Sequence, residues 1–457
     1  MTNDILKHIY NACDPYEPAT AEYYVDCSSA RGNTSALTQE FYRNLLLADD
    51  YLCFLFSGHF GCGKSSELEE LARTLQAPSP GQARYFPILV NVSDYLDDYD
   101  VSPLDIQLAI VAEVAAALRN RAQVELKDNY FVRRFDEIKR FFLSDVELKE
   151  GELQLGMVKL KLQRLAKDPE ARQKVRQTLQ PQQSSLLREL NTVFEEARLR
   201  VQRMPVAPGD QPYTDIVLIL DNLEKIRKTE GFPEGRASLH ELFVDRYQQF
   251  TSFKTHIIYT MPLPLIRSNA GPQLQQRYGP LFVLPMVKVI DRKDRAPYTK
   301  GISYLRELIL KRVGNGKLED YITPGALDFL LTYSGGHIRS LMIFLQNACT
   351  YTETLPIPLN AVHKAIGQTV TLFSTSIPDT FWPRLAQLDR STNQQIVVGD
   401  PDYLAMLENL NVLEYVNGGE ENNPFEPIEP WYAVNPIVRE LQKFKSAIKA
   451  LESASKA

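Results

Sequence analysis

Cysteine is scarce in this chain. The 457 residues contain five cysteines, and no two of them form a CxxC pair. An odd number of scattered cysteines argues against a disulfide framework and against a zinc site built from cysteine pairs. The cysteine content is typical of a protein that works in a reducing compartment.

Long apolar runs, a basic overall charge and internal repeats are also missing. No stretch approaches the roughly 20 apolar residues of a membrane helix, and residues 1–7 lack the apolar core of a signal peptide. The formal net charge of −6 gives no global reason to expect nucleic-acid binding. We therefore expect a soluble, cytoplasmic protein of two or three domains that does not bind membranes.

Short apolar runs alternate with helical patterns along the first two thirds of the chain. Runs that are apolar at nearly every position are typical of strands buried on both faces of a parallel sheet. The pattern predicts an α/β fold with helices on both faces of the sheet. The five predicted strands are 51–56, 86–92, 215–220, 255–260 and 281–284.

The remaining patterns divide the chain into units. Between residues 118 and 203 there are 19 Lys and Arg against 13 Asp and Glu. We interpret this segment as a basic helical insertion, with a small hairpin near Gly151, that projects from the sheet domain.

Helices dominate after Gly301, and two strands near 412–434 with a closing helix from Pro436 describe a winged-helix domain. The predicted units are a lead-in (1–50), a sheet domain (51–300) with its insertion (119–205), a helical lid (301–376) and the winged helix (377–457).

A glycine-rich loop joins the first predicted strand to the helix that follows. Glycines let successive backbone N–H groups turn toward phosphates, and the helix N-terminus adds its positive end. Lys64 supplies a charge for the β- and γ-phosphates, and Ser65 offers a hydroxyl to Mg²⁺. The pattern predicts a binding site for ATP and Mg²⁺. The predicted nucleotide-binding residues are Gly58, His59, Phe60, Gly61, Cys62, Gly63, Lys64, Ser65 and Ser66.

Two carboxylates follow the third predicted strand. Asp221 ends the strand, where a Walker B aspartate helps to hold Mg²⁺. The next residue, Asn222, cannot act as a base, so we predict that Glu224 is the general base that activates water. The alternative is that Glu224 only begins a helix, where the helix dipole favours an acid. We interpret His59 and His337 as residues that hold the backbone in position.

These motifs resemble P-loop ATPases at the border of the AAA+ and STAND classes, and are similar to initiator-type AAA+ proteins with a helical lid and a C-terminal winged helix. The resemblance implies a sensor 1 role for Thr260 and a sensor 2 role for Arg339, after Gly335 and Gly336. The alternative for Arg339 is a surface arginine on an amphipathic helix.

The resemblance has two further implications. Arg277 corresponds to an arginine finger that would act on a neighbouring subunit, and Arg31, in Ala30-Arg31-Gly32, to a residue lining the adenine pocket. Asn222 and the basic insertion depart from the AAA+ pattern. An acid three residues after the Walker B aspartate is the arrangement of STAND and KAP-type ATPases.

STAND proteins are nucleotide-gated switches, many of them in bacterial conflict and anti-phage systems. The resemblance therefore implies an ATP-hydrolysing switch that forms a homo-oligomer or binds a partner protein through its lid or winged helix. A DNA-directed ATPase (initiator, loader or transposition regulator) is the alternative. It is favoured by the basic insertion and the lysines of the last helix, and opposed by the acidic wing at 417–426. A scaffold that holds nucleotide without hydrolysis is a third possibility, because of Asn222.

Overall fold

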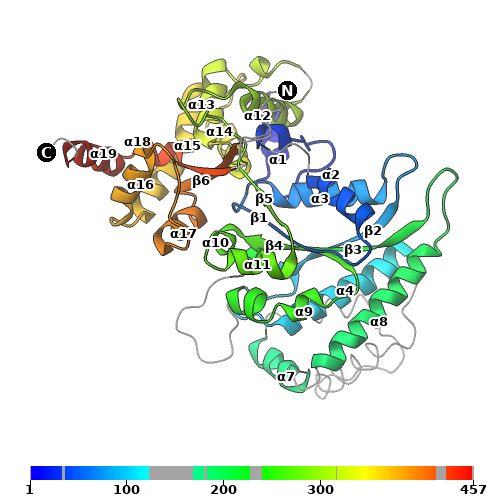
Figure 1. Cartoon of the computed structure of the whole chain (residues 1–457). Coiled ribbons are helices and arrows are strands. Elements are labelled where there is room, and N and C mark those ends of the chain that lie inside the picture. Colours follow the sequence, from blue (N-terminus) through cyan, green and yellow to red (C-terminus); the bar gives the residue numbers. More distant parts are fainter. Residues whose placement is uncertain are drawn as a thin grey trace.

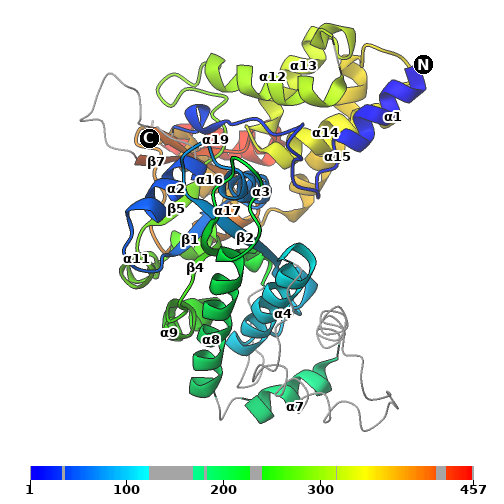
Figure 2. The same ribbon diagram turned by 90° about the vertical axis from the view of Figure 1, so that its right-hand side faces the viewer.

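The computed structural model describes residues 2–32, 37–122, 168–179, 183–226, 239–314, 316–417 and 429–454. The hairpin predicted near Gly151 and most of the predicted acidic wing lie outside these residues. Figure 1 shows a sheet unit at the centre, a helical lid above it and a C-terminal unit to one side. Figure 2 shows the lid and the helix α7 (Pro169–Leu179) at opposite ends of the molecule.

The sheet has five strands in the order β2-β3-β4-β1-β5, and every pairing is parallel. Each predicted apolar run forms one of these strands, so the predicted α/β P-loop NTPase sheet is confirmed. Because β4 lies between β1 and β3, Thr260 near the end of β4 stands between the phosphate loop and the end of β3. The strands are β1 (Cys53–Gly58), β2 (Arg84–Asn91), β3 (Tyr213–Asp221), β4 (His256–Pro262) and β5 (Leu281–Leu284).

Alternate side chains of each strand point to opposite faces of the sheet. Because these side chains are mostly apolar, both faces are covered by other elements. One face packs against α4 (Pro103–Ala122) and α8 (Gln183–Gln202). The other packs against α2 (Leu37–Leu47), α3 (Lys64–Gln76) and a C-terminal β-ribbon. Each buried aliphatic or aromatic side chain stabilises this arrangement by about 1.5–3 kcal/mol.

The helix α8 corrects our expectation for the insertion. It lies within the segment 119–205 but does not project, because Leu190, Val193 and Phe194 are fully buried in the core beneath the sheet. Its average composition is polar, whereas its apolar residues recur every three or four positions and form one buried stripe. The helix α7 is held instead by ion pairs of Arg172 and Arg176 with aspartates at the start of α4 and just before it.

The described part of the lid contains four α-helices, and the N-terminal helix packs against this unit. The helix α1 (Thr2–Ala12) buries Leu6 and Ile9 in the lid core and packs against two lid helices. The predicted lead-in is therefore divided, since α1 joins the lid while α2 joins the sheet. The lid helices are α12 (Thr299–Val313), α13 (Pro324–Ser334), α14 (Ile338–Thr350) and α15 (Leu359–Ser376).

The C-terminal unit has the helices and antiparallel ribbon of a winged helix. Its ribbon is not free, because the stacked rings of Tyr415 and Trp431 are buried against the sheet core (ring centroids 4.7 Å apart). The Met286 N–H also donates to the Glu414 carbonyl (3.0 Å). The elements are α16 (Phe381–Arg390), α17 (Pro401–Glu408), β6 (Val412–Asn417), β7 (Glu429–Val434), α18 (Pro436–Glu440) and α19 (Gln442–Ala454). No helix in the described ranges has both the length and the apolar character needed to span a bilayer.

Candidate nucleotide-binding site

The glycine-rich loop lies between β1 and α3, as predicted. Gly61 and Gly63 adopt positive φ angles of +86° and +108°, which favour glycine, and α3 begins directly at Lys64. A Cβ on Gly61 would lie 2.7 Å from Nε2 of His337, so glycine is also needed for the close approach of the lid.

Lys64 and Glu224 form a buried ion pair. Nζ of Lys64 lies 2.9 Å from Oε1 of Glu224, and the two side chains are only 3% and 7% exposed. The ammonium also donates to the carbonyl oxygens of Gly58 (3.2 Å) and His59 (3.1 Å). Burial alone would raise the pKa of Glu224, but the neighbouring Lys64 ammonium holds that pKa below its usual range. Burial likewise opposes the charge on Lys64, and the Glu224 carboxylate raises its pKa.

A left-handed turn at Asn222 directs Glu224 back toward the loop. Asn222 has φ of 71°, a conformation that asparagine tolerates better than most residues. Its N–H donates to Oδ1 of Asp221 (2.8 Å), and its side chain donates to Oδ1 of Asn91 at the end of β2 (2.8 Å). Asn222 therefore shapes the turn that carries Glu224.

Thr260 supports the same turn from the neighbouring strand. Its fully buried hydroxyl accepts a hydrogen bond from the Leu223 N–H (3.0 Å) and also helps to lower the pKa of Glu224. The strand order places Thr260 between the phosphate loop and the end of β3. In this structure Thr260 thus holds the backbone that positions Glu224.

Asp221 and Ser65 are suited to hold a divalent cation. Burial and the nearby Glu224 carboxylate raise the pKa of Asp221, while the Ser65 hydroxyl bonds to Asp221 and lowers it. A cation beside Asp221 would relieve this unfavourable burial of negative charge. Among the described residues no group of three or more His, Cys, Asp or Glu side chains could hold a metal. Mg²⁺ here would therefore depend on nucleotide phosphates for further ligands.

The lid is hydrogen bonded to the phosphate loop. The Arg339 N–H donates to the Gly61 carbonyl (3.1 Å), and Nε2 of His337 donates to the Phe60 carbonyl (2.8 Å). The other ring nitrogen of His337 accepts from the Ser340 N–H and caps α14. Gly336 permits this contact, because a Cβ there would lie 1.8 Å from the Val287 carbonyl oxygen.

The Arg339 side chain lines a cavity beside the phosphate loop. Its guanidinium lies 4.3 Å from the centre of the Phe60 ring, and Nε donates to the Pro15 carbonyl (2.9 Å). Nη1 is buried and has no hydrogen-bond partner among the residues that the structure describes. Burial lowers the pKa of Arg339, so an anion in this cavity would offset the cost of burying the cation.

The C-terminal unit is bonded to the same loop through His59. Nδ1 of His59 donates to the Leu407 carbonyl in α17 (3.2 Å), and Nε2 accepts from the Glu414 N–H in β6 (2.9 Å). Glu414 is itself fixed by two hydrogen bonds from Arg267 (2.7 and 2.6 Å). Complete burial lowers the pKa of both His59 and His337 to about 3, so both rings are neutral at ordinary pH. Their predicted role in holding the backbone is supported by these contacts.

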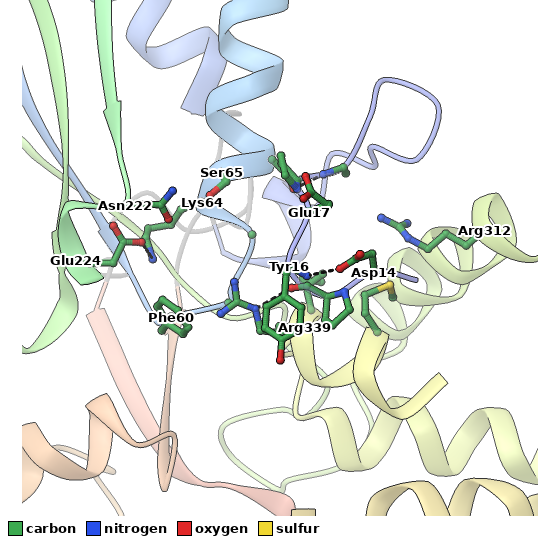
Figure 3. Close-up of a pocket in the computed structure, with 18 residues that line it drawn as sticks. Asp14, Tyr16, Glu17, Phe60, Lys64, Ser65, Asn222, Glu224, Arg312 and Arg339 are labelled. Carbon is green, nitrogen blue, oxygen red and sulfur yellow. Dashed lines mark hydrogen bonds and ion pairs between the residues drawn. The ribbon is translucent and has the colours of Figure 1, made fainter. Parts of the chain in front are cut away.

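A cavity that is open to solvent lies over the loop. Figure 3 shows Lys64, Asn222 and Glu224 at one side and Arg312 at the other. The predicted residues that line it are Phe60, Gly61, Gly63, Lys64, Ser65, Ser66, Glu224 and Arg339. Seven predicted residues do not line it: Gly58, His59, Cys62, Asp221, Thr260, Arg31 and Arg277.

Arg31 and Arg277 make their contacts outside the cavity lining. Arg31 donates from Nη2 to the Cys62 carbonyl (2.9 Å) and from Nη1 to the Pro285 carbonyl. These hydrogen bonds tie the phosphate loop to the segment after β5. Arg277 donates to the Val244 carbonyl and lies 4.6 Å from the centre of the Tyr247 ring. Its predicted action on a neighbouring subunit stays a prediction.

The N-terminal segment 14–19, which was not predicted to belong to the site, forms one wall of the cavity. The Ala19 N–H donates to Oγ of Ser66 (2.9 Å), which ties this segment to α3. Pro15 and Pro18 favour an extended chain, and they were the sequence signal for an extended segment here. Nothing in the sequence connected them to a loop more than 40 residues away.

Comparisons with known proteins give structural likeness only. No family model and no curated protein matches the chain. The Orc1 protein of Aeropyrum pernix, solved with DNA, is 13% identical, with 92% of each chain covered and a TM-score of 0.35. The Drosophila ORC bound to DNA is 11% identical (95% and 94% covered, TM-score 0.36). Cdc6p from Pyrobaculum aerophilum is 11% identical (96% and 98% covered, TM-score 0.39). Likeness this weak carries no conclusion about function, whereas the strand order and the phosphate loop place the chain in the P-loop NTPase fold.

Proposed function

We propose that this protein is a Mg²⁺-dependent ATPase of AAA+/STAND type that acts as a switch. The observation that carries the proposal is the dual attachment of the phosphate loop. Phe60 and Gly61 are bonded to the lid, while His59 is bonded to the winged helix. A ligand that repositions this loop would therefore disturb both C-terminal units at once.

The Lys64–Glu224 pair supports a way for ATP to activate its own hydrolysis. Phosphates would compete with Glu224 for the Lys64 ammonium, because each needs the same donor. Once Lys64 turned to the phosphates, burial would raise the pKa of Glu224 and make it a better proton acceptor. Glu224 would then take a proton from the water that attacks the γ-phosphate.

The remaining predicted residues have roles that fit this reaction. Ser65 and Asp221 would hold Mg²⁺, which neutralises charge on the phosphates. Arg339 would give up the Pro15 carbonyl for the γ-phosphate and so link the lid to the nucleotide state. Arg277 would complete the site of a neighbouring copy, which makes a homo-oligomer the expected assembly. We favour a role in a bacterial defence system, in which a partner protein binds the lid or the winged helix.

The alternative of a DNA-directed ATPase has less support in the described residues. Three cations of the last two helices are already paired, Arg439 with Asp389, Lys443 with Asp379 and Lys445 with Glu440. The ribbon of the winged helix is packed against the sheet. A scaffold that never hydrolyses ATP remains the simpler alternative, and turnover measurements decide between it and the switch.

Hydrogen–deuterium exchange tests the coupling. Saturating Mg-ATP, with ADP and no nucleotide for comparison, should change exchange in β6 and at the start of α14. His59→Ala should lose the change in β6 and keep that in α14, since it cuts only the bonds to the winged helix. Nucleotide binding that leaves exchange in β6 and α14 unaltered would contradict the switch.

A further inference from the structure

Arg312 is a buried cation that lines the proposed nucleotide cavity and forms no ion pair with a carboxylate of the described residues. It lies near the end of α12, is 6% exposed and lines the cavity. No ion pair of Arg312 is found in the part of the chain that the structure describes. Burial lowers its pKa, and no acidic residue is among the groups that offset this effect. Charged side chains are seldom buried without a partner of opposite charge.

The contacts of Arg312 leave one edge of its guanidinium available. Nη1 donates to the carbonyl oxygens of Tyr23 (3.1 Å) and Leu308 (3.0 Å). Nε is buried without a hydrogen-bond partner, and within the described ranges Nη2 has none either. The edge formed by Nε and Nη2 can donate two parallel hydrogen bonds, which a lysine could not do.

The position of this edge indicates which part of a ligand it meets. Figure 3 shows Arg312 across the cavity from Lys64 and Glu224, with Asp14 and Glu17 of the N-terminal segment nearby. Asp14 is exposed, and its Oδ1 accepts from the Tyr16 N–H. A nucleotide whose phosphates lie at Lys64 would extend its ribose and base toward Arg312.

We infer that Arg312 binds the nucleoside end of the nucleotide by donating two hydrogen bonds to a pair of acceptor atoms. This inference rests on the proposed nucleotide site. Two parts of a nucleotide carry such a pair, the ribose 2′- and 3′-oxygens and the O6/N7 edge of guanine. Adenine has an acceptor beside a donor on the corresponding edge.

Titrations with ligands that contain or lack a nucleoside test the inference. Arg312→Met and Arg312→Lys should weaken binding of the nucleotide by about 10-fold to 100-fold, as expected for hydrogen bonds from a charged donor. Binding of Mg-tripolyphosphate, which has no nucleoside, should stay within twofold of wild type. A thermal unfolding curve of free Arg312→Met checks that this variant is folded before its affinities are compared with those of wild type.

The adjacent Lys311 provides the matched control. Its ammonium donates to the Tyr24 carbonyl (2.6 Å) but does not line the cavity. Lys311→Met therefore removes a similar tether to the N-terminal segment and should bind ATP like wild type.

Two further ligands identify the acceptor pair. If the pair is on the ribose, 2′,3′-dideoxy-ATP should bind wild type and Arg312→Lys equally. If it is on the base, wild type should prefer GTP to ATP and Arg312→Lys should lose that preference. Equal losses for ATP and tripolyphosphate, or no loss for any nucleotide, would overturn the inference alone. Wild type that binds neither ATP nor GTP would overturn the proposed function as well.

Discussion

Nζ of Lys64 and Oε1 of Glu224 lie 2.9 Å apart in a pair that is almost completely buried. The residue expected to bind phosphate and the residue expected to activate water are thus paired with each other. The pair neutralises two charges that would be costly to bury separately. Because of this pairing, whether Glu224 can act as a base depends on the position of the Lys64 ammonium.

The first prediction concerns the stability of the pair. Lys64→Met should lower the free energy of unfolding by about 3–5 kcal/mol, because it leaves Glu224 buried without its cation. Lys64→Met with Glu224→Gln should recover much of this loss, since the amide is neutral. Chemical denaturation of the two single variants and the double variant measures the coupling. Additive losses would show that the two side chains do not interact.

The second prediction concerns pH. The folded protein lowers the pKa of His59 and His337 to about 3, whereas an unfolded histidine titrates near pH 6.5. Below about pH 6.5 the unfolded chain binds more protons, so stability should fall as the pH falls toward 3. Each histidine should contribute about 1.4 kcal/mol per pH unit.

Unfolding curves between about pH 7 and pH 5 measure this slope, within the range over which the two histidines should act. His59→Gln should reduce it, because glutamine does not titrate. The exposed His8 offers a control in His8→Gln, which should keep the wild-type slope. An unchanged slope in His59→Gln would contradict the assignment of a buried neutral ring.

The third prediction concerns DNA. Ion pairs of Lys443 with Asp379 (2.8 Å) and of Lys445 with Glu440 (2.7 Å) reduce the charge that the last helix can offer to phosphates. We expect weak binding that is independent of sequence and falls steeply as salt rises. Fluorescence anisotropy with a labelled duplex at two salt concentrations measures it. A sub-micromolar complex with one defined duplex at physiological salt would favour the DNA-directed alternative.

The fourth prediction concerns assembly. If Arg277 acts on a neighbouring copy, the ATPase rate per chain should rise with protein concentration. Arg277→Ala should then lose turnover while it keeps its affinity for Mg-ATP. Turnover that is independent of concentration, with an Arg277→Ala rate equal to wild type, would remove Arg277 from the site.

Most of the sheet could be predicted from the sequence because its signals are local. The run 215–220 is apolar at nearly every position and forms β3, and the loop before Lys64 carries its own glycines. The helix α8 was misjudged because one buried stripe was averaged with its charged face. To detect such a stripe, each position of the segment must be compared with the period of an α-helix.

The contacts across the site could not be predicted in this way. His59 meets Glu414, and Arg339 meets Pro15, over separations of 355 and 324 residues. No local pattern in the sequence records which distant backbone groups meet a side chain. The sequence alone also predicted only part of the role of Asn222. Its lack of a carboxylate was evident, whereas its left-handed backbone appears only in the structure.

The central claim is that Glu224 is the base that activates water, and single-turnover hydrolysis by paired variants tests it most directly. Asn222→Gly is the matched control, because glycine keeps the left-handed turn at φ of 71° without a side chain. Glu224→Gln should bind Mg-ATP but hydrolyse it roughly 10²–10⁴ times more slowly than wild type, because the amide cannot accept a proton. Asn222→Gly should hydrolyse ATP within a few-fold of wild type. Wild-type hydrolysis by Glu224→Gln, with Asn222→Gly inactive, would contradict the account.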